Sequence, residues 1–352
     1  APFRTPSSCN NRLENLQYLA SCLTRHYFEG FLLAGSHRCE REENTSYHPS
    51  KPADSQQALL AHCLPSLRTR FLAYGSRQNG QPPKQLTTNP LDALATFQVP
   101  HSWFASFYLV STLCSFIWFS QILLDQSLWR NLAALTDIKN SMTLDQIIVT
   151  WILMLLQGVR RLYESLEFTK PSNARMWIGH WALGVWFYAS MSIAVWIEGA
   201  RMFWPGRNPC LTPLTFFSFS SNLLQESFNF SHLTIEPPCL RTFVGCLIFI
   251  LASGVQHDCH AYLASLKKYS VPEHPVFQRL VCPHYFVECL IYLAISIVAA
   301  PAGSLLNWTI VCALIFVSVN LGVTADGTRD WYGQKFGPDS VSGKWRMIPF
   351  VF

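Results

Sequence analysis

The chain of 352 residues is long enough for two soluble domains, but only 13% of its residues are charged, against about 25% in an ordinary soluble protein. Hydrophobic residues make up 50%, aromatic residues 14%, and the mean hydropathy is +0.17. The net charge is +5, and no basic run carries interleaved aromatic residues. This composition excludes a disordered chain, a coiled coil and a collagen-like repeat, argues against a nucleic-acid partner, and favours a polytopic membrane protein.

The N-terminal region, residues 1–65, differs from the rest of the chain. Its apolar stretch at 16–35 is interrupted by charged residues, Arg25 and Glu29 among them, and the stretch 40–57 is polar. We therefore expect loops or amphipathic helices that lie on the membrane surface. A further membrane span in this region is the alternative.

Six apolar runs follow, each close to the length of about 20 residues that a membrane-spanning helix needs. The sequence therefore predicts an all-α, polytopic membrane bundle of about six to seven transmembrane helices. The six runs are residues 102–124, 146–166, 177–197, 240–266, 284–300 and 304–324.

Lysine and arginine alternate across these spans. Fifteen of the 26 basic residues lie in segments 66–84, 160–176, 267–279 and 329–346, and the alternate segments after residue 84 hold only five. Short loops rich in lysine and arginine stay on the cytoplasmic side of a membrane. We therefore expect the C-terminus to be cytoplasmic.

The second span ends in a cluster of polar residues. Gln157, Arg160 or Arg161, and Glu164 recur at the three- and four-residue spacing that places them on one face of a helix. An ionisable residue inside a span costs at least about 2.5 kcal/mol, so it normally faces a cavity or a partner. The cluster predicts either an arginine–glutamate clasp or a cationic wall for a phosphorylated ligand.

The fourth and fifth spans carry further polar residues at their cytoplasmic ends. Gln256, His260 and Lys267 share one stripe, and hydrogen-bond donors so spaced suit phosphate and ribose oxygens. His284 and Glu288 lie one turn apart just inside the fifth span. Such a pair can bind a metal, but it leaves a zinc ion without a third ligand, so we expect none here.

The last span leads into a basic and aromatic C-terminal segment. Asn320, Arg329, Tyr332 and Lys344 are predicted to converge beside the cytoplasmic surface. The chain has neither a G-x-G-x-x-G turn after a strand nor a P-loop. A nucleotide would therefore have to be held by side chains between helices.

Several short motifs carry a resemblance that covers about residues 65 to 352. They are Gln157-Gly-Val-Arg-Arg-Leu-Tyr-Glu164, Ser172-Asn-Ala-Arg-Met176, His260-x-x-Leu-x-x-Leu-Lys267, Cys282-Pro-His-Tyr-Phe-Val-Glu288 and Trp331-Tyr332-x-x-Lys-Phe336. Together they resemble the steroid 5α-reductase family. Within it, the Arg-Arg-Leu-Tyr-Glu and Pro-His-Tyr elements favour the polyprenol (polyprenal) reductase branch, in a fungal form.

The resemblance implies a multi-pass enzyme of the endoplasmic reticulum that uses NADPH to reduce the α-isoprene double bond of polyprenal. The product would lead to dolichol for protein N-glycosylation. The membrane reductase domain would span residues 66–352, with the cofactor-binding half at about 240–352. The cofactor-binding residues that the resemblance implies are Gln256, His260, Lys267, His284, Glu288, Asn320 and Tyr332. The basic residues Arg329 and Lys344 of the C-terminal segment are further candidates for binding the cofactor.

The chemistry of this reduction requires a donor for the substrate oxygen. Hydride adds to the β-carbon of an enal only if the carbonyl oxygen, where negative charge collects, is polarised. Our candidates are Tyr163, Tyr74 and Arg161, with Glu164 orienting the arginine. The steroid members have a substrate-facing tyrosine where this chain has Gly158, which leaves the proton donor unassigned.

Three other interpretations stay open. A steroid 5α-reductase would share the fold and the cofactor and differ in the substrate pocket. A lipid-substrate enzyme similar to isoprenylcysteine methyltransferases would bind S-adenosylmethionine instead. A transporter or a membrane scaffold would be expected to show paired half-helices or an inverted repeat, and neither is visible in the sequence. The lipid bilayer and a long isoprenoid are the expected partners, and no oligomer is implied.

Overall fold

The computed structural model describes residues 96–124, 126–133, 142–170, 173–200, 239–267 and 270–352. The N-terminal region 1–65 and Tyr74 lie outside the described residues. The boundary of the expected reductase domain at residue 66 lies outside them as well and stays a prediction.

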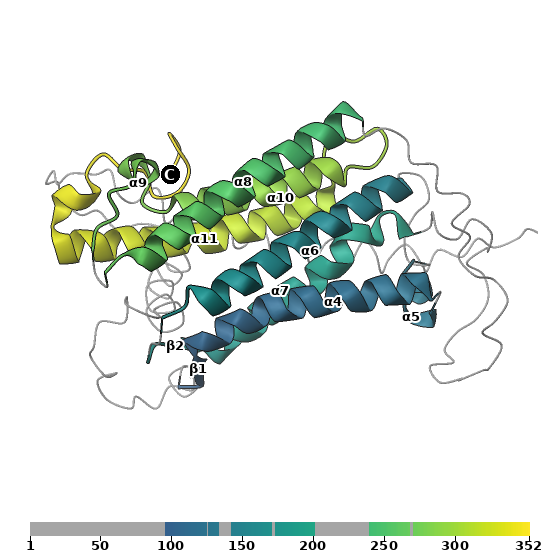
Figure 1. Cartoon of the computed structure of the whole chain (residues 1–352), viewed down its shortest axis with the longest axis horizontal. Helices are drawn as coiled ribbons and strands as arrows, with labels where there is room; N and C mark the ends of the chain where they lie inside the picture. Colours follow the sequence, from purple (N-terminus) through teal and green to yellow (C-terminus); the bar gives the residue numbers. More distant parts are fainter. Residues whose placement is uncertain (1–95, 125, 134–141, 171–172, 201–238, 268–269) are drawn as a thin grey trace, which may run out of the picture.

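Six long helices form a bundle, and each corresponds to one expected span (Figure 1). Short helices precede or join them: η3 (His101–Phe104), α5 (Ser127–Ala133), α9 (Pro275–Arg279) and η6 (Pro338–Val341). The long helices are α4 (Ala105–Leu123), α6 (Leu144–Glu167), α7 (Ile178–Ile197), α8 (Leu240–Ser265), α10 (Pro283–Val298) and α11 (Trp308–Phe336).

Four of these helices are long and apolar enough to cross a membrane: His101–Leu123, Ile178–Ile197, Leu240–Ser265 and Trp308–Phe336. The protein is therefore a multi-pass membrane protein, and the predicted all-α class is confirmed. The helix α6, which carries five charged residues, is not in this group, and α10 is apolar but has only 16 residues. The exact number of spans and the side of the membrane that holds the C-terminus stay predictions.

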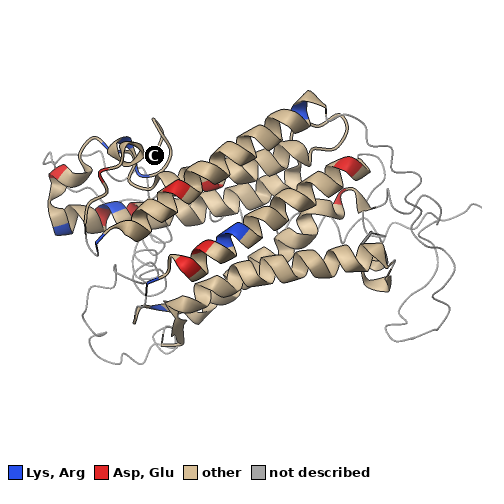
Figure 2. Ribbon diagram, viewed as in Figure 1, with Lys and Arg blue, Asp and Glu red and all other residues tan. Residues whose placement is uncertain are grey.

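Most of the charged residues lie toward one end of the bundle, and a few lie at the opposite end (Figure 2). The end with most of the charged residues holds the short strands, α9 and the C-terminus (Figure 1). The described parts of the basic segments 160–176, 267–279 and 329–346 lie there, so they share one side of the bundle, as the alternation of basic residues predicts.

A small sheet that the sequence analysis does not predict joins the starts of α4 and α7. The strands β1 (Gln98–Pro100) and β2 (Arg175–Trp177) pair antiparallel, with Val99 opposite Met176. The pairing continues on both sides, since the His101 amide donates to the Ala174 carbonyl at 2.9 Å. Strands of three residues are too short to show a two-residue alternation, which is why the sequence does not reveal them.

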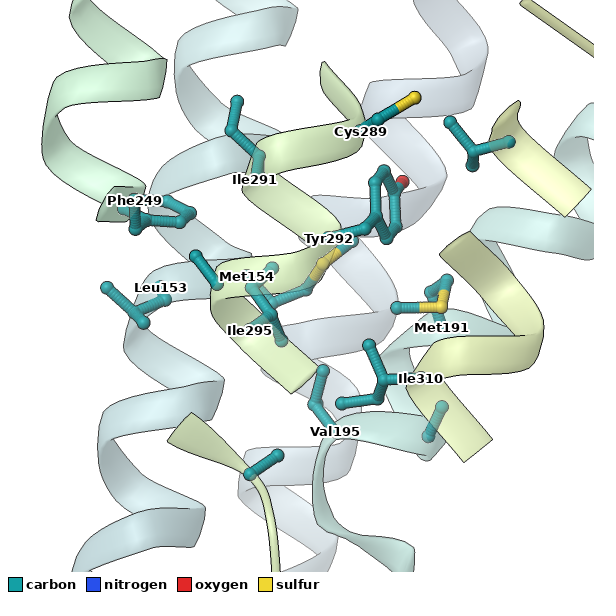
Figure 3. Packing of buried hydrophobic residues seen from close by; sticks show 14 of the residues in the cluster. Leu153, Met154, Met191, Val195, Phe249, Cys289, Ile291, Tyr292, Ile295 and Ile310 are labelled. Atoms are coloured by element: carbon teal, nitrogen blue, oxygen red, sulfur yellow. The ribbon is translucent and has the colours of Figure 1, made fainter. Parts of the chain in front are cut away.

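The helix α10 is the centre of the bundle. Most of its side chains are buried, and Ile291 and Ile295 are fully enclosed. They pack among side chains of the surrounding helices, such as Met154 of α6, Val195 of α7 and Phe249 of α8 (Figure 3). Because protein surrounds α10, polar groups placed on it face other helices and not lipid.

Polar side chains satisfy the last carbonyl groups of α10. Gln146 Nε2 donates to two of the carbonyls at 298–300, at 3.2 and 2.9 Å. Asn307 Nδ2 donates to the Ala299 carbonyl at 3.2 Å, and an Arg241 guanidinium nitrogen donates at 2.7 Å to the Ala300 carbonyl, which Gln146 also reaches. A helix of 16 residues is roughly 24 Å long, whereas the hydrocarbon layer is about 30 Å thick. These side-chain donors supply the hydrogen bonds that another helical turn at the end of α10 would have supplied.

We expect Gln146→Ala to lower the free energy of unfolding by about 1–3 kcal/mol, because it leaves the buried Val298 carbonyl without its side-chain donor, whereas the Ala300 carbonyl keeps its hydrogen bond from Arg241. The measurement is the thermal or denaturant unfolding midpoint of the protein in detergent. Gln126→Ala is the matched control, since the Gln126 amide reaches only the nearby Leu124 carbonyl. Equal midpoints for the two variants would contradict the capping role.

Candidate active site

A cavity of about 150 Å³ lies between the helices, close to the charged end of the bundle. All six long helices contribute to its wall. One part of the wall is polar, formed by Arg161, Gln256, His260, His284 and Glu288 among others. Another part is apolar, formed by Phe104, Phe107, Leu183, Phe187 and Phe316 among others.

Glu164 of α6 does not line the cavity itself but contacts side chains of the polar wall. Its side chain is buried, and its carboxylate accepts hydrogen bonds from Arg160 and, at 2.5 Å, from Arg161. The Nδ1 atoms of His257 and His260 lie 2.9 and 2.8 Å from its two oxygens. The structure thus contains the arginine–glutamate clasp that was one of the two alternatives from the sequence.

Glutamine side chains connect α6, α8 and α10 at the next layer. Gln157 Nε2 donates to Glu288 Oε2 at 3.3 Å, and Gln256 Nε2 donates to the same oxygen. Arg160 donates to the side-chain oxygens of both glutamines. Buried polar groups linked in this way hold their helices in one register.

Tyrosine side chains that the sequence analysis does not single out also line the cavity. Tyr108 of α4, Tyr188 of α7 and Tyr292 of α10 belong to its wall. Arg161 donates to the Tyr108 oxygen at 2.8 Å. The signal in the sequence is weak, because an aromatic residue in an apolar span is ordinary. On α4, however, Tyr108 begins a polar stripe that continues through Ser111 and Ser115.

Most of the predicted site residues meet at this cavity. Glu164 stands directly behind the wall, in contact with Arg161 and His260. The helical spacings explain this result, since each group lies one turn from another on its own helix. The predicted residues that line the cavity are Arg161, Gln256, His260, His284, Glu288 and Asn320.

Other predicted residues lie elsewhere. The Tyr163 side chain is 56% exposed and its ring contacts Phe168, so it does not line the cavity. Lys267 is exposed and follows the end of α8 at Ser265. Tyr332 and Lys344 line a second, much smaller pocket near α9. Arg329 lines neither of the two pockets.

Comparisons with known proteins agree with this arrangement. Residues 210–352 match the protein family described as 3-oxo-5-alpha-steroid 4-dehydrogenase. The C-terminal part of the chain is therefore similar to the steroid 5α-reductase family. The match supports an oxidoreductase that acts on a carbon–carbon double bond, and such a reductase reaction implies a nicotinamide cofactor.

Several relatives cover most of the chain. Polyprenal reductase 2 of Oryza sativa subsp. japonica is 28% identical over 332 residues, which cover 84% of this chain and 90% of that protein. Polyprenal reductase of Saccharomyces cerevisiae is 26% identical, with coverages of 82% and 87%. Polyprenal reductase of Xenopus tropicalis is 28% identical, with coverages of 74% and 82%.

Proposed function

We propose that this protein uses NADPH to reduce the α-isoprene double bond of polyprenal, in the membrane of the endoplasmic reticulum, as a step toward dolichol for N-glycosylation. The observation that carries the proposal is the cavity with one polar and one apolar part, enclosed by membrane helices. A polar head next to an isoprenoid tail has the same two-part chemistry. The likeness to polyprenal reductases of plants, a fungus and an animal supports the choice of substrate.

The residues at the polar end fit a nicotinamide group. A cavity of about 150 Å³ holds one six-membered ring. The carboxamide of the ring needs an acceptor, which Glu288 would supply beside His284, whose buried Nδ1 has no hydrogen-bond partner among the described residues. When bound, the group supplies a hydride. The rest of the dinucleotide would lie outside the cavity, toward the basic residues at the charged end of the bundle.

Two alternatives differ in what they bind. A steroid 5α-reductase would take a 3-oxo-Δ4 steroid into the same cavity, and a methyltransferase-like enzyme would bind S-adenosylmethionine. We favour polyprenal because the relatives that cover most of the chain are polyprenal reductases. The buried Arg161 and Glu164 beside the cavity are paired with each other, so they also suit a catalytic site better than an ion pathway.

The test uses the full chain purified in detergent. The protein is incubated with NADPH and either polyprenal, polyprenol or testosterone, and the products are analysed by mass spectrometry. Polyprenal should gain one hydride and one proton, whereas the free alcohol should not react because it has no carbonyl oxygen to accept charge. Reduction of testosterone in preference to polyprenal would identify a steroid enzyme. Binding of S-adenosylmethionine without NADPH would identify the methyltransferase alternative.

A charge reversal tests where the phosphates of NADPH bind. We expect Lys267→Glu to raise the KM for NADPH at least about tenfold, which corresponds to about 1.4 kcal/mol, because it places a negative charge beside the phosphates. Lys335→Glu is the control, since Lys335 is also exposed and lies over the Trp331 ring. Equal KM values for NADPH in the two variants would contradict the role of Lys267.

A further inference from the structure

We propose that the Tyr108 hydroxyl is the acid that polarises the substrate carbonyl; this inference rests on the proposed function. Tyr108 is only 4% exposed and lines the cavity. Its oxygen accepts a hydrogen bond from Arg161 at 2.8 Å, and the guanidinium carbon lies 4.8 Å from its ring centroid. An oxygen that accepts from a cation keeps its own proton for another acceptor, and the cation makes that proton a stronger donor.

The arginine partner is itself held in place. Arg161 also donates to Glu164 at 2.5 Å, and the same nitrogen lies 2.8 Å from His260 Nδ1. The guanidinium therefore stays beside the tyrosine without free rotation. Among the described tyrosines, Tyr188 and Tyr292 also line the cavity, but the hydrogen bond from Arg161 goes to Tyr108.

Gly158 explains why this tyrosine comes from α4. A Cβ atom at Gly158 would lie 3.1 Å from Ser111 Oγ and 3.2 Å from Thr112 Oγ1, so the glycine allows α4 to approach α6 closely. The two helices run in opposite directions (Figure 1). One turn from this contact toward the charged end therefore leads to Tyr108 on one helix and to Arg161 on the other. A tyrosine on α6 at position 158 has no space here, and α4 supplies the hydroxyl group instead.

The step balances as follows for an α,β-unsaturated aldehyde. The bound nicotinamide would supply a hydride that forms a C–H bond at the β-carbon, while the double-bond electrons would move to the carbonyl oxygen. Tyr108 gives its proton to that oxygen and becomes a phenolate paired with Arg161. The enol then takes a proton from water at its α-carbon while its O–H proton returns to Tyr108. The net change is one hydride and one proton added across the double bond.

The experiment compares Tyr108→Phe with the unmodified protein, using NADPH and polyprenal in detergent. We expect kcat to fall by about 100-fold or more, the usual loss when one donor to a developing oxyanion is removed. Tyr292→Phe is the matched control, because it removes a hydroxyl from the same cavity that has no hydrogen-bond partner among the described residues. This control should lose less than about tenfold by the same scale.

An infrared measurement provides a readout that is independent of turnover. The carbonyl stretch of a bound, isotope-labelled saturated aldehyde should shift to lower frequency in the unmodified protein, and the shift should be absent in Tyr108→Phe. If the phenylalanine variant does not fold, a fluorinated tyrosine at position 108 keeps the shape and makes the phenol more acidic. The alkaline limb of the pH–rate profile should then move to lower pH.

The outcomes separate the two proposals. An unmodified protein that does not reduce polyprenal contradicts the proposed function. A protein that reduces polyprenal, and whose Tyr108→Phe variant keeps full kcat and the full carbonyl shift, contradicts only the role of Tyr108. The role of Tyr108 is also contradicted if the alkaline limb of the pH–rate profile does not move when a fluorinated tyrosine is placed at position 108.

Discussion

Glu164→Ala should yield little folded protein. The variant removes the carboxylate that pairs with Arg160 and Arg161 and that contacts His257 and His260. Removing one partner of a buried ion pair costs about 3–5 kcal/mol, because the remaining charge stays buried without compensation. That loss is a large fraction of the 5–15 kcal/mol by which a protein domain is usually stable. The measurements are the yield of monodisperse protein in detergent and its thermal unfolding midpoint.

Other variants separate charge from shape at this position. Glu164→Gln keeps the size and should be intermediate, and combining it with Arg160→Gln should recover part of the lost stability, since it removes one uncompensated charge. Glu167→Ala is the matched control, because Glu167 is exposed on the same helix. A normal yield and midpoint for Glu164→Ala would show that the clasp does not stabilise the bundle.

Glu288→Gln should lower activity strongly while leaving the fold intact. Gln157 and Gln256 both donate to Glu288 Oε2, and among the described residues no hydrogen bond reaches Oε1. Oε1 of this cavity-lining residue therefore remains for a ligand, and we expect it to accept from the carboxamide of the cofactor. The neutral amide should weaken NADPH binding about ten- to 100-fold, as expected for a hydrogen bond to a charged group worth about 1.5–3 kcal/mol.

The measurement for Glu288→Gln is the dissociation constant of NADPH by fluorescence, with kcat/KM for polyprenal alongside it. Glu198→Gln is the control, since Glu198 is a carboxylate at the far end of the bundle that accepts from Thr309. Unchanged NADPH binding with an unchanged unfolding midpoint would return Glu288 to a purely structural role.

Helical spacing explains how much of this site the sequence predicts. Gln157, Arg160 and Glu164 fall on one face, and His284 and Glu288 lie one turn apart, because any α-helix places residues three or four apart together. The same geometry explains the position of Tyr163. It follows Arg161 by two residues, and residues two apart point to different sides of a helix, so it faces outward.

The position of Tyr108 on α4, by contrast, depends on how α4 packs against α6. Tyr108 reaches Arg161 only because Gly158 lets two helices approach closely, and the sequence pattern gives no measure of that distance. The sequence analysis places Lys267 on the same helical stripe as Gln256 and His260, but the helix α8 ends at Ser265. Helical periodicity no longer predicts the direction of a side chain that lies beyond the end of the helix.

The short central helix α10 affects how the chain enters a membrane during synthesis. A segment of 16 residues that carries Glu288 is a weak signal for insertion by itself, since it is shorter than the hydrocarbon layer is thick and carries a charge. Its entry therefore has to be cooperative with neighbours such as α8, which offer polar partners and a protein surface. If α10 failed to enter, α11 would insert in the opposite direction, and the residues that follow it would be delivered to the wrong compartment. Correct topology of the last helix thus depends on assembly of the earlier ones.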